Sequence, residues 1–201
     1  AKYGADTFYS GDLARFIVNE IDKNHGFLTK DDLLKYKAIW REPSHFNYNG
    51  LDILTPPPPS SGSLVFSGLE ALTLGNKSHS AHQLLAEAML KMFSKRRRNF
   101  GDPAFTSTET VSESPETTSL CTIDSGGNAA CLTYSNNNHS GVVIPDTGIL
   151  MNNSMALFSP WPDNPNAVVG GKRPISSMMP TLLFKNGKIK MAIGASGSTR
   201  I

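Results

Sequence analysis

The hydrophobic positions in the first part of the chain recur at helical spacing. They predict a helix over residues 10–23, with Ser10 as its N-cap and Gly26 beyond its C-terminal end. A capping box that begins at Thr29 predicts a second, short helix through Tyr36. The apolar face of the first helix is formed by Leu13, Phe16, Ile17 and Ile21. We therefore expect the chain to open with packed, amphipathic helices.

A strand pair and two further helices are predicted next. The run FNYNGLDILT (residues 46–55) has β-rich segments on either side of a tight Asn-Gly turn. The proline run that follows it cannot continue a sheet. Residues 64–74 return to helical spacing, and Ser80 with Gln83 forms the N-terminal signature of another helix. The apolar residues of that helix are Leu84, Leu85, Ala88, Met89, Met92 and Phe93.

The hydrophobic periodicity is lost between Gly101 and Glu116, where serine, threonine, glutamate and proline dominate, as is typical of an exposed loop. Beyond this segment, short β-rich runs are separated by Gly-Gly, Asn-rich or Asn-Gly turns. These runs are SLCTID, NAACLTYS, TGILM, TLLFK and KIKMAIGA. Because helices dominate first and strands second, the order of elements predicts an α+β fold with layered helices and sheet.

The composition is that of an ordinary globular protein. Of its 201 residues, 39% are hydrophobic and 18% are charged, and the formal net charge is +2. The basic excess is concentrated at residues 95–98, without a second basic or aromatic stripe. We interpret this run as the solvated end of a helix and expect no nucleic-acid partner. No apolar segment approaches the ~20 residues of a membrane helix. The chain starts at Ala1 without a leader-like segment, as expected of a mature product or a fragment.

Two cysteines, Cys121 and Cys131, lie symmetrically about an SGGN turn. If the flanking segments pair as a hairpin, their side chains lie close to opposite each other, and an oxidising compartment could join them. The alternative is a pair of buried thiols. The sequence has no cluster of Cys with His at zinc spacing, so no metal site is predicted. Glycosylation sequons at Asn76, Asn138 and Asn152 matter only if the chain is secreted.

Thr117 has the sequence setting that an N-terminal threonine nucleophile requires. A threonine hydroxyl is a poor nucleophile unless a base lies beside it, and the α-amino group freed by cleavage of the preceding peptide bond can be that base. The flexible segment before Thr117 allows a new terminus to form, and the predicted strand after it aims the hydroxyl. The alternative reading of the same residues is an ordinary strand start.

Several blocks of the sequence resemble the γ-glutamyltranspeptidase (glutathione hydrolase) family of the N-terminal-nucleophile hydrolase superfamily. They are TTSLCTIDSGGNAACLTYS, TGILMNN, KRPISSMMPT and GASGSTRI in the second part, and FYSGDLARFIVNEI, GFLTKDDLLKYKA, PPPPSSG and FGDPAF in the first. The resemblance covers essentially the whole chain. It implies an α+β fold that is part of a four-layer αββα sandwich. Residues 1–116 would be the C-terminal part of the large-subunit region and residues 117–201 the N-terminal part of the small-subunit region, together one structural domain.

The resemblance also implies roles for individual residues. Thr117 matches the family's nucleophile, which self-cleavage between Glu116 and Thr117 would release. Ser135 falls where the family has a second threonine that supports the nucleophile, and Asn137 matches an asparagine that holds the substrate's α-amino end. The remaining matches are the serine pair for the substrate's α-carboxylate, Ser176 and Ser177, and the oxyanion-hole positions, Gly197 and Ser198. Without the resemblance, the serine pair and Gly197 are compatible with plain turns beside strands.

The chemistry that the resemblance implies is acyl transfer. Thr117 Oγ attacks the γ-amide carbon of a glutamyl donor such as glutathione, its terminal amine relays the proton, and backbone N–H groups near Gly197 stabilise the oxyanion. Water, an amino acid or a peptide accepts the acyl group, and no metal or cofactor is required. The family also implies pairing of the cleaved large and small subunits, and a periplasmic, cell-surface or extracellular location.

Several positions near the implied site depart from the family's pattern, among them Ser198, which stands where the family has a glycine. Ser119 replaces a histidine, Ser154 stands where the family has Gln or Glu, and Leu157 stands where it has an Asp that grips the substrate's α-ammonium group. Loss of one charge-assisted bond of that kind costs roughly 1.5–3 kcal/mol. The family's large subunit also begins upstream of Ala1, where it carries a carboxylate-clamping arginine, and its small subunit continues beyond Ile201. Three functions stay open: a γ-glutamyl hydrolase or transferase, a relative with impaired or lost activity that serves as a binding or interaction module, and an acylase of non-glutamyl amides.

Overall fold

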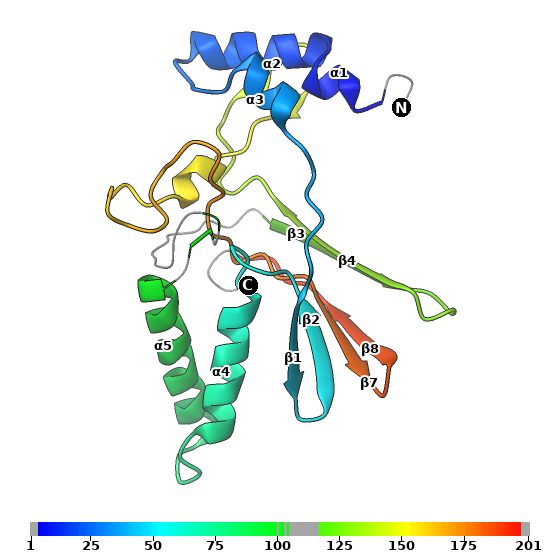
Figure 1. The fold of residues 1–201 in the computed structure, drawn as a ribbon, viewed down its shortest axis with the longest axis vertical. Coiled ribbons are helices and arrows are strands. Elements are labelled where there is room, and N and C mark those ends of the chain that lie inside the picture. The colour runs from blue at the N-terminus through cyan, green and yellow to red at the C-terminus, as the bar shows by residue number, and fades with distance from the viewer. Residues whose placement is uncertain (1–3, 100, 103, 105–116, 198–201) are drawn as a thin grey trace. The chain divides into compact units, whose positions relative to one another are not determined.

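The computed structural model describes residues 4–99, 101–102, 104 and 117–197, apart from the side chains of residues 97–99. By their contacts, the residues form two compact units: Ala1–Trp40 with His139–Asn152, and Arg41–Asn138 with Asn153–Ile201. Each unit contains residues from both sides of the boundary between Glu116 and Thr117. The assignment of two subunit regions on either side of that boundary therefore stays a prediction. The predicted α+β class is confirmed, because helices and antiparallel strands are both present (Figure 1).

The first unit is mainly helical. It contains α1 (Asp6–Tyr9), α2 (Asp12–Lys23) and α3 (Lys30–Lys35), and a short antiparallel ribbon of β5 (Val143–Ile144) and β6 (Ile149–Leu150). The predicted capping box at the start of α3 is confirmed, with Thr29 and Asp32 each satisfying the other's backbone N–H. The buried core of this unit consists of Ala14, Ile17, Leu33 and Ile144.

Two details predicted for the first helix are wrong. Ser10 is the C-cap of the separate helix α1, and Gly11 is the N-cap of α2. Phe16 does not lie in the core, since 43% of its surface is exposed and the guanidinium carbon of Arg15 lies 5.3 Å from the centre of its ring. The smaller Ala14 takes the buried position instead.

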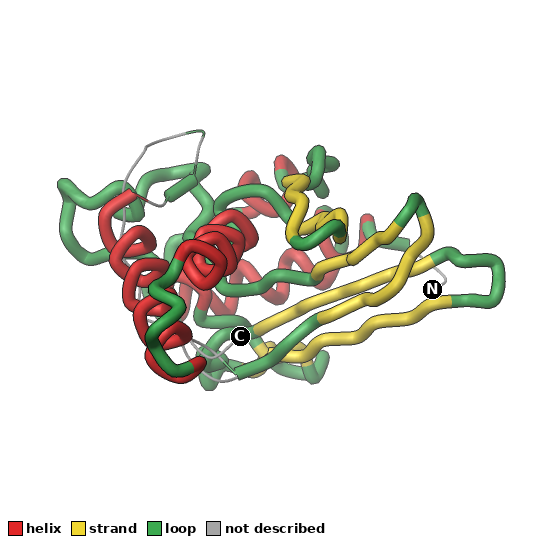
Figure 2. The backbone as a smooth tube through the Cα atoms, turned by 90° about the horizontal axis from the view of Figure 1, so that it is seen from below, coloured by secondary structure: helices red, strands yellow, loops and turns green. Residues whose placement is uncertain are grey.

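The second unit is built around a four-stranded antiparallel sheet. The strands follow the order β1 (Ser44–Tyr48), β2 (Leu51–Thr55), β7 (Thr181–Lys185) and β8 (Lys188–Ile193), and they run side by side in Figure 2. The two hairpin turns of the sheet are both Asn-Gly pairs with positive φ at each residue, which is what a two-residue turn requires. The predicted strand pair around the first of these turns is confirmed.

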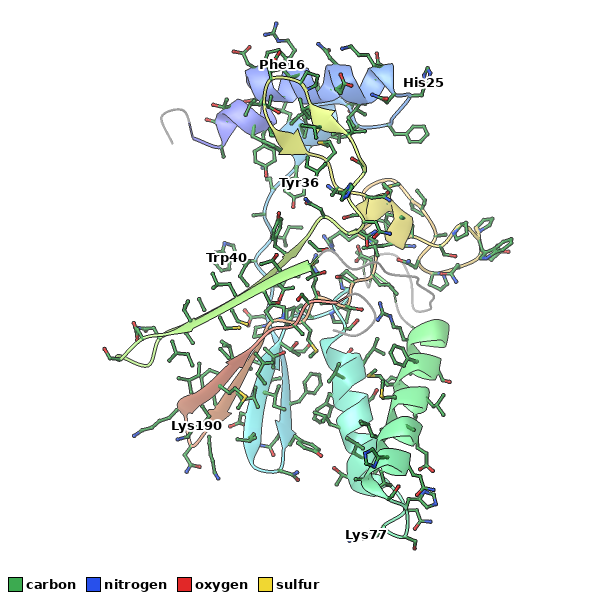
Figure 3. All side chains as sticks on the ribbon, turned by 180° about the vertical axis from the view of Figure 1, so that it is seen from behind. Phe16, His25, Tyr36, Trp40, Lys77 and Lys190 are labelled. Atoms are coloured by element: carbon green, nitrogen blue, oxygen red, sulfur yellow. The ribbon has the colours of Figure 1, made fainter. Side chains whose placement is uncertain are left out.

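Two helices lie beside this sheet, α4 (Gly62–Leu74) and α5 (Ala81–Asn99) (Figure 1). In Figure 3, the labelled Lys77 lies at the turn between these two helices, and the labelled Lys190 lies on β8. The predicted N-cap of α5 is confirmed, because Ser80 N–H donates to Gln83 Oε1 at 2.8 Å and Gln83 N–H donates to Ser80 Oγ at 3.3 Å. A stacked pair, Phe46 on β1 and Phe66 on α4, joins the helices to the sheet with ring centres 4.2 Å apart.

The predicted hairpin after the Ser/Thr-rich segment is also confirmed, as β3 (Thr117–Ile123) and β4 (Ala129–Ser135). Its two faces differ in exposure, as alternation along a strand requires. Cys131 Sγ donates to Ile193 O at 3.1 Å, so the half-buried face lies against β8. That face carries Thr117, Ser119, Cys121, Cys131, Thr133 and Ser135, whereas Leu120, Leu132 and Tyr134 on the other face are 56–59% exposed.

A short 3-10 helix, η1 (Ser154–Leu157), precedes the long segment that leads to β7. The loop predicted between Gly101 and Glu116 falls mostly outside the described residues. Among the helices that the structure describes, none combines the length and the apolar character needed to cross a membrane.

Candidate active site

Thr117 and Ser135 face each other at the open end of the β3–β4 hairpin. Thr117 is the first residue of β3 and pairs directly with Ser135, the last residue of β4. Thr117 Oγ1 donates to Ser135 Oγ at 3.2 Å, and the Asn137 backbone N–H donates to the same oxygen at 2.9 Å. The structure thus brings together three of the residues to which the family resemblance assigns roles.

Asn137 is held rigidly next to this pair. Its side chain is buried, with 6% of the residue exposed, and its φ of +56° lies in the left-handed region, which asparagine adopts more readily than most residues. Its Nδ2 donates to Asn153 O at 2.9 Å, and Asn153 N–H donates back to Asn136 O at 3.0 Å. The asparagine side chain is therefore fixed between the end of β4 and the start of η1.

The serine pair lies in the segment before β7 and is anchored to the proline run. Ser176 forms an isolated parallel bridge with Ser60, and its N–H donates to Pro59 O at 3.0 Å. Ser61 Oγ donates to Ser176 O at 2.7 Å, and Ser176 Oγ accepts from Met178 N–H at 3.1 Å. The PPPPSSG block and the PISSM block are therefore one connected structure.

Arg96 is a member of this site that the sequence interpretation missed. Its side chain is buried, with 8% of the residue exposed, and its Nη1 donates to Ser177 Oγ at 2.7 Å. The interpretation of residues 95–98 as a solvated helix end is therefore wrong for Arg96, although Lys95 beside it is exposed. A small cavity adjoins the contact, lined by Ser61, Leu64, Val65, Met92, Phe93, Arg96 and Ser177.

A signal for the burial of Arg96 was present in the sequence. Ala88, Met92 and Arg96 are spaced at intervals of four residues, which places them on one face of α5. Ala88 is buried, and Met92 packs against the core formed by Leu64 and Ile175. Arg96 therefore continues the buried face of the helix, despite its place in a run of basic residues.

Two further buried polar side chains hold the segment in front of the serine pair. Asp102 is fully buried and accepts from the backbone N–H of Arg173 at 3.0 Å and from its Nη2 at 3.3 Å. Asn166 is also fully buried: its Nδ2 donates to Leu157 O at 2.7 Å, and its Oδ1 accepts from Ile175 N–H at 3.1 Å. These contacts fix the backbone immediately before the serine pair.

Ser119 connects β3 to the segment that leads to Gly197. Ser119 Oγ donates to Ala195 O at 2.9 Å, which uses its single hydrogen, so Thr133 Oγ1, 2.9 Å away, donates to Ser119 Oγ. Gly194 packs so closely here that a Cβ would lie 2.8 Å from that oxygen. Gly197 itself has a φ of +132°, a conformation that favours glycine. The serine therefore makes hydrogen bonds of its own at the position where the family has histidine.

The remaining positions that the family resemblance singled out have different outcomes. Glu116 and Ser198 lie outside the described residues, so the cleavage junction and the second oxyanion position stay predictions. Ser154 opens η1, and Leu157 at its other end is 8% exposed, so an apolar side chain is buried where the family has a carboxylate. In the part of the chain that the structure describes, no group of three His, Cys, Asp or Glu side chains could hold a metal ion.

Comparison with known proteins identifies the family to which this arrangement belongs. The family model described as Gamma-glutamyltranspeptidase matches residues 1–115 and 106–201. The chain belongs to the gamma-glutamyltranspeptidase family. It is 33% identical over 253 residues to the glutathione hydrolase proenzyme of Escherichia coli (strain K12), a match that covers 100% of this chain and 44% of that protein.

A second relative of comparable identity is named as an acylase. The chain is 31% identical over 239 residues to the acylase ACY 1 proenzyme of Pseudomonas sp. (strain SE83), which covers 100% of this chain and 43% of the relative. Among solved structures, cephalosporin acylase from Bacillus halodurans matches with a TM-score of 0.77 and 28% identity, over 93% of this chain and 40% of that one. The predicted superfamily, that of the N-terminal-nucleophile hydrolases, is thereby confirmed. The chain spans less than half the length of these relatives.

Proposed function

We propose that this chain belongs to an N-terminal-nucleophile enzyme that hydrolyses or transfers γ-glutamyl groups from donors such as glutathione, with Thr117 as the nucleophile. The observation that carries the proposal is the contact of Thr117 Oγ1 with Ser135 Oγ at 3.2 Å, at the first residue of a well-paired strand. The glutathione hydrolase name of the Escherichia coli relative supports the choice of donor.

The proposed reaction begins when cleavage before Thr117 frees its α-amino group. That amine takes the Oγ1 proton as Oγ1 attacks the γ-amide carbon, and it then passes the proton to the leaving amine. Ser135 Oγ, held by the Asn137 N–H at 2.9 Å, keeps the Thr117 Oγ1 atom in position at the end of β3. Backbone N–H groups near Gly197 stabilise the oxyanion. Water, an amino acid or a peptide then releases the glutamyl group from Thr117.

The proposed donor is recognised at both ends of its amino-acid group. Ser176 and Ser177 bind the α-carboxylate, and Arg96 behind Ser177 polarises that hydroxyl towards donation and brings a positive charge close to the anion. Asn137 accepts from the α-ammonium group through Oδ1, because its Nδ2 donates to Asn153 O.

A second candidate function, an acylase of non-glutamyl amides, is favoured by Leu157. The leucine is buried and offers no carboxylate to an ammonium group. Acyl donors that keep the distal carboxylate and lack the α-amine, such as glutaryl amides, would use the serine pair without that contact. The acylase names of two relatives are in line with this candidate.

Mass spectrometry of the purified protein during incubation tests the nucleophile. We expect products that correspond to residues 1–116 and 117–201, and no cleavage of Thr117→Ala. The cleaved protein is then offered γ-glutamyl p-nitroanilide and glutaryl p-nitroanilide. One charge-assisted contact to the α-ammonium group corresponds to a difference of about tenfold or more between the two donors. A preference of that size for the glutamyl donor supports the first function, and the reverse preference supports the acylase. A chain that stays as intact as Thr117→Ala overturns both and favours a binding or interaction module.

Two further parts of the proposal follow from membership of the family. The two products of cleavage stay paired as large and small subunits, which size-exclusion chromatography of the cleaved protein tests. The proposed location is the periplasm, the cell surface or the medium, which fractionation of the native cells tests.

A further inference from the structure

Cys121 and Cys131 occupy directly opposed positions in the β3–β4 hairpin. The Cα atoms of directly opposed residues in antiparallel strands are about 4.5–5.5 Å apart, which lies within the range of about 4.4–6.8 Å that disulfides span. Both side chains project from the half-buried face, and their Sγ atoms are 2.6 Å apart. The two thiols are therefore placed to bond without movement of the backbone.

We propose that Cys121 and Cys131 form a reversible cross-strand disulfide that staples the hairpin carrying Thr117 and Ser135. The oxidant is a low-molecular-weight disulfide. One cysteine thiolate attacks a sulfur of this molecule, which forms a mixed disulfide and releases one small thiol. The other cysteine attacks the protein sulfur of the mixed disulfide and releases the second small thiol. The two protein thiols lose two protons and two electrons, and the small disulfide is reduced to two thiols.

The surroundings of Cys131 favour closure within the hairpin over reaction with bulk reagents. Its Sγ donates to Ile193 O at 3.1 Å on the neighbouring strand β8, which holds the side chain against Cys121. Burial, and then the hydrogen bond with Cys121, raises the pKa of Cys131 to about 11. Cys131 therefore keeps its proton at neutral pH and reacts best with a sulfur that is already beside it.

The position of the pair gives the staple a consequence for the candidate active site, and this consequence rests on the proposed function. Cleavage before Thr117 makes that residue a chain end, so the start of β3 then depends on its pairing with β4 and on the bond from Ser119 to Ala195 O. A slip of one residue in register would turn the Thr117 side chain to the opposite face of the hairpin. A covalent bond between Cys121 and Cys131, on the same face as Thr117 and Ser135, prevents that slip.

The disulfide is tested on the folded, reduced protein. The protein is incubated with oxidised glutathione, quenched with iodoacetamide and analysed by mass spectrometry. We expect a product about 2 Da lighter than the reduced chain, without alkylation, whose peptides join Cys121 to Cys131. Dithiothreitol should restore two alkylated cysteines. The matched control, Cys131→Ser, should accumulate a stable glutathione adduct at Cys121. Two glutathione adducts on the unaltered protein, or two cysteines that stay open to alkylation, would overturn the proposal.

Hydrogen exchange measures the staple without any substitution. Backbone amides of residues 118–122 should exchange about tenfold or more slowly in the oxidised than in the reduced protein, because opening of the strand end is then restricted. Equal exchange in a protein that carries the disulfide would overturn the stapling role. Neither measurement depends on hydrolysis, so their outcome is separate from the success or failure of Thr117 as a nucleophile.

Discussion

Removal of the Arg96 charge tests whether a buried cation holds the serine pair. Arg96 Nη1 donates to Ser177 Oγ at 2.7 Å, and the two residues are 8% and 5% exposed. A hydrogen bond that involves a charged group contributes about 1.5–3 kcal/mol, and little water is present here to replace it. We therefore expect a coupling free energy of about 1.5–3 kcal/mol between Arg96 and Ser177.

A double-mutant cycle isolates this coupling from the other effects of each substitution. Arg96→Met keeps most of the side-chain length, and Ser177→Ala removes the hydroxyl. Urea unfolding of the unaltered protein, both single variants and the double variant gives the four free energies of unfolding that the cycle needs. At a slope of about 2 kcal/mol per molar urea, the coupling corresponds to a midpoint difference of roughly 1 M. Lys95→Met, at an exposed position on the same helix, is the matched control and should change stability by less than about 0.5 kcal/mol. A coupling below about 0.5 kcal/mol, the value of an exposed pair, would refute the buried link.

The same variants have an expected kinetic signature. If Arg96 supports the carboxylate subsite, Arg96→Met and Ser177→Ala should each raise KM about tenfold or more for glutamyl and glutaryl donors alike, because both donors carry the carboxylate. The kcat of each donor should change much less, since the scissile amide is bound elsewhere. An effect on kcat alone would contradict this role.

Three further changes have defined outcomes. Ser135→Ala removes the acceptor of the Thr117 hydroxyl and should slow formation of the 117–201 product about tenfold, whereas Ser135→Thr should be cleaved at the normal rate. Equal cleavage rates of the alanine and threonine variants would show that the hydroxyl of residue 135 is not needed. Ser119→Ala loses the bond to Ala195 O and should lower kcat by roughly tenfold at unchanged KM, and a change in KM alone would contradict this. In Cys121→Ser, the burial that raises the pKa of Cys131 is retained, and only the thiolate reacts. Alkylation of Cys131 should therefore accelerate about tenfold per pH unit from pH 7 to 9, and a plateau below pH 9 would contradict the effect of burial.

Elements governed by neighbouring residues could be predicted from the sequence. The Asn-Gly turns, the capping boxes at Thr29 and Ser80, and the hairpin on either side of the SGGN turn each depend on a few adjacent residues, and the structure has all of them. The misplaced cap at Ser10 has the same local origin. Two small residues stand in a row there, and a one-turn helix that the periodicity does not reveal takes the first of them.

Contacts between distant segments could not be predicted in the same way. Arg96 and Ser177 are 81 residues apart, and Asp102 and Arg173 are 71 apart, so no local pattern records their pairing. The spacing of Ala88, Met92 and Arg96 places Arg96 on the buried face of α5, but its partner on the segment before β7 is decided by tertiary packing. Family resemblance did locate Thr117, Ser135 and Asn137 near one another, because it draws on position in a known fold rather than on spacing.

The hydrogen bonds around Asn153 have a consequence for how each unit responds to substitution. Residues 139–152 belong to the first unit, whereas the chain before and after them, at Asn138 and Asn153, belongs to the second. The bonds of Asn153 to Asn136 and Asn137 join the two ends of this excursion of the chain. The excursion packs its core with α2 and α3, not with the sheet. Substitutions at its buried position, Ile144, therefore act on the core of the first unit, while the bonds of Asn153 keep Asn137 in its place in the second.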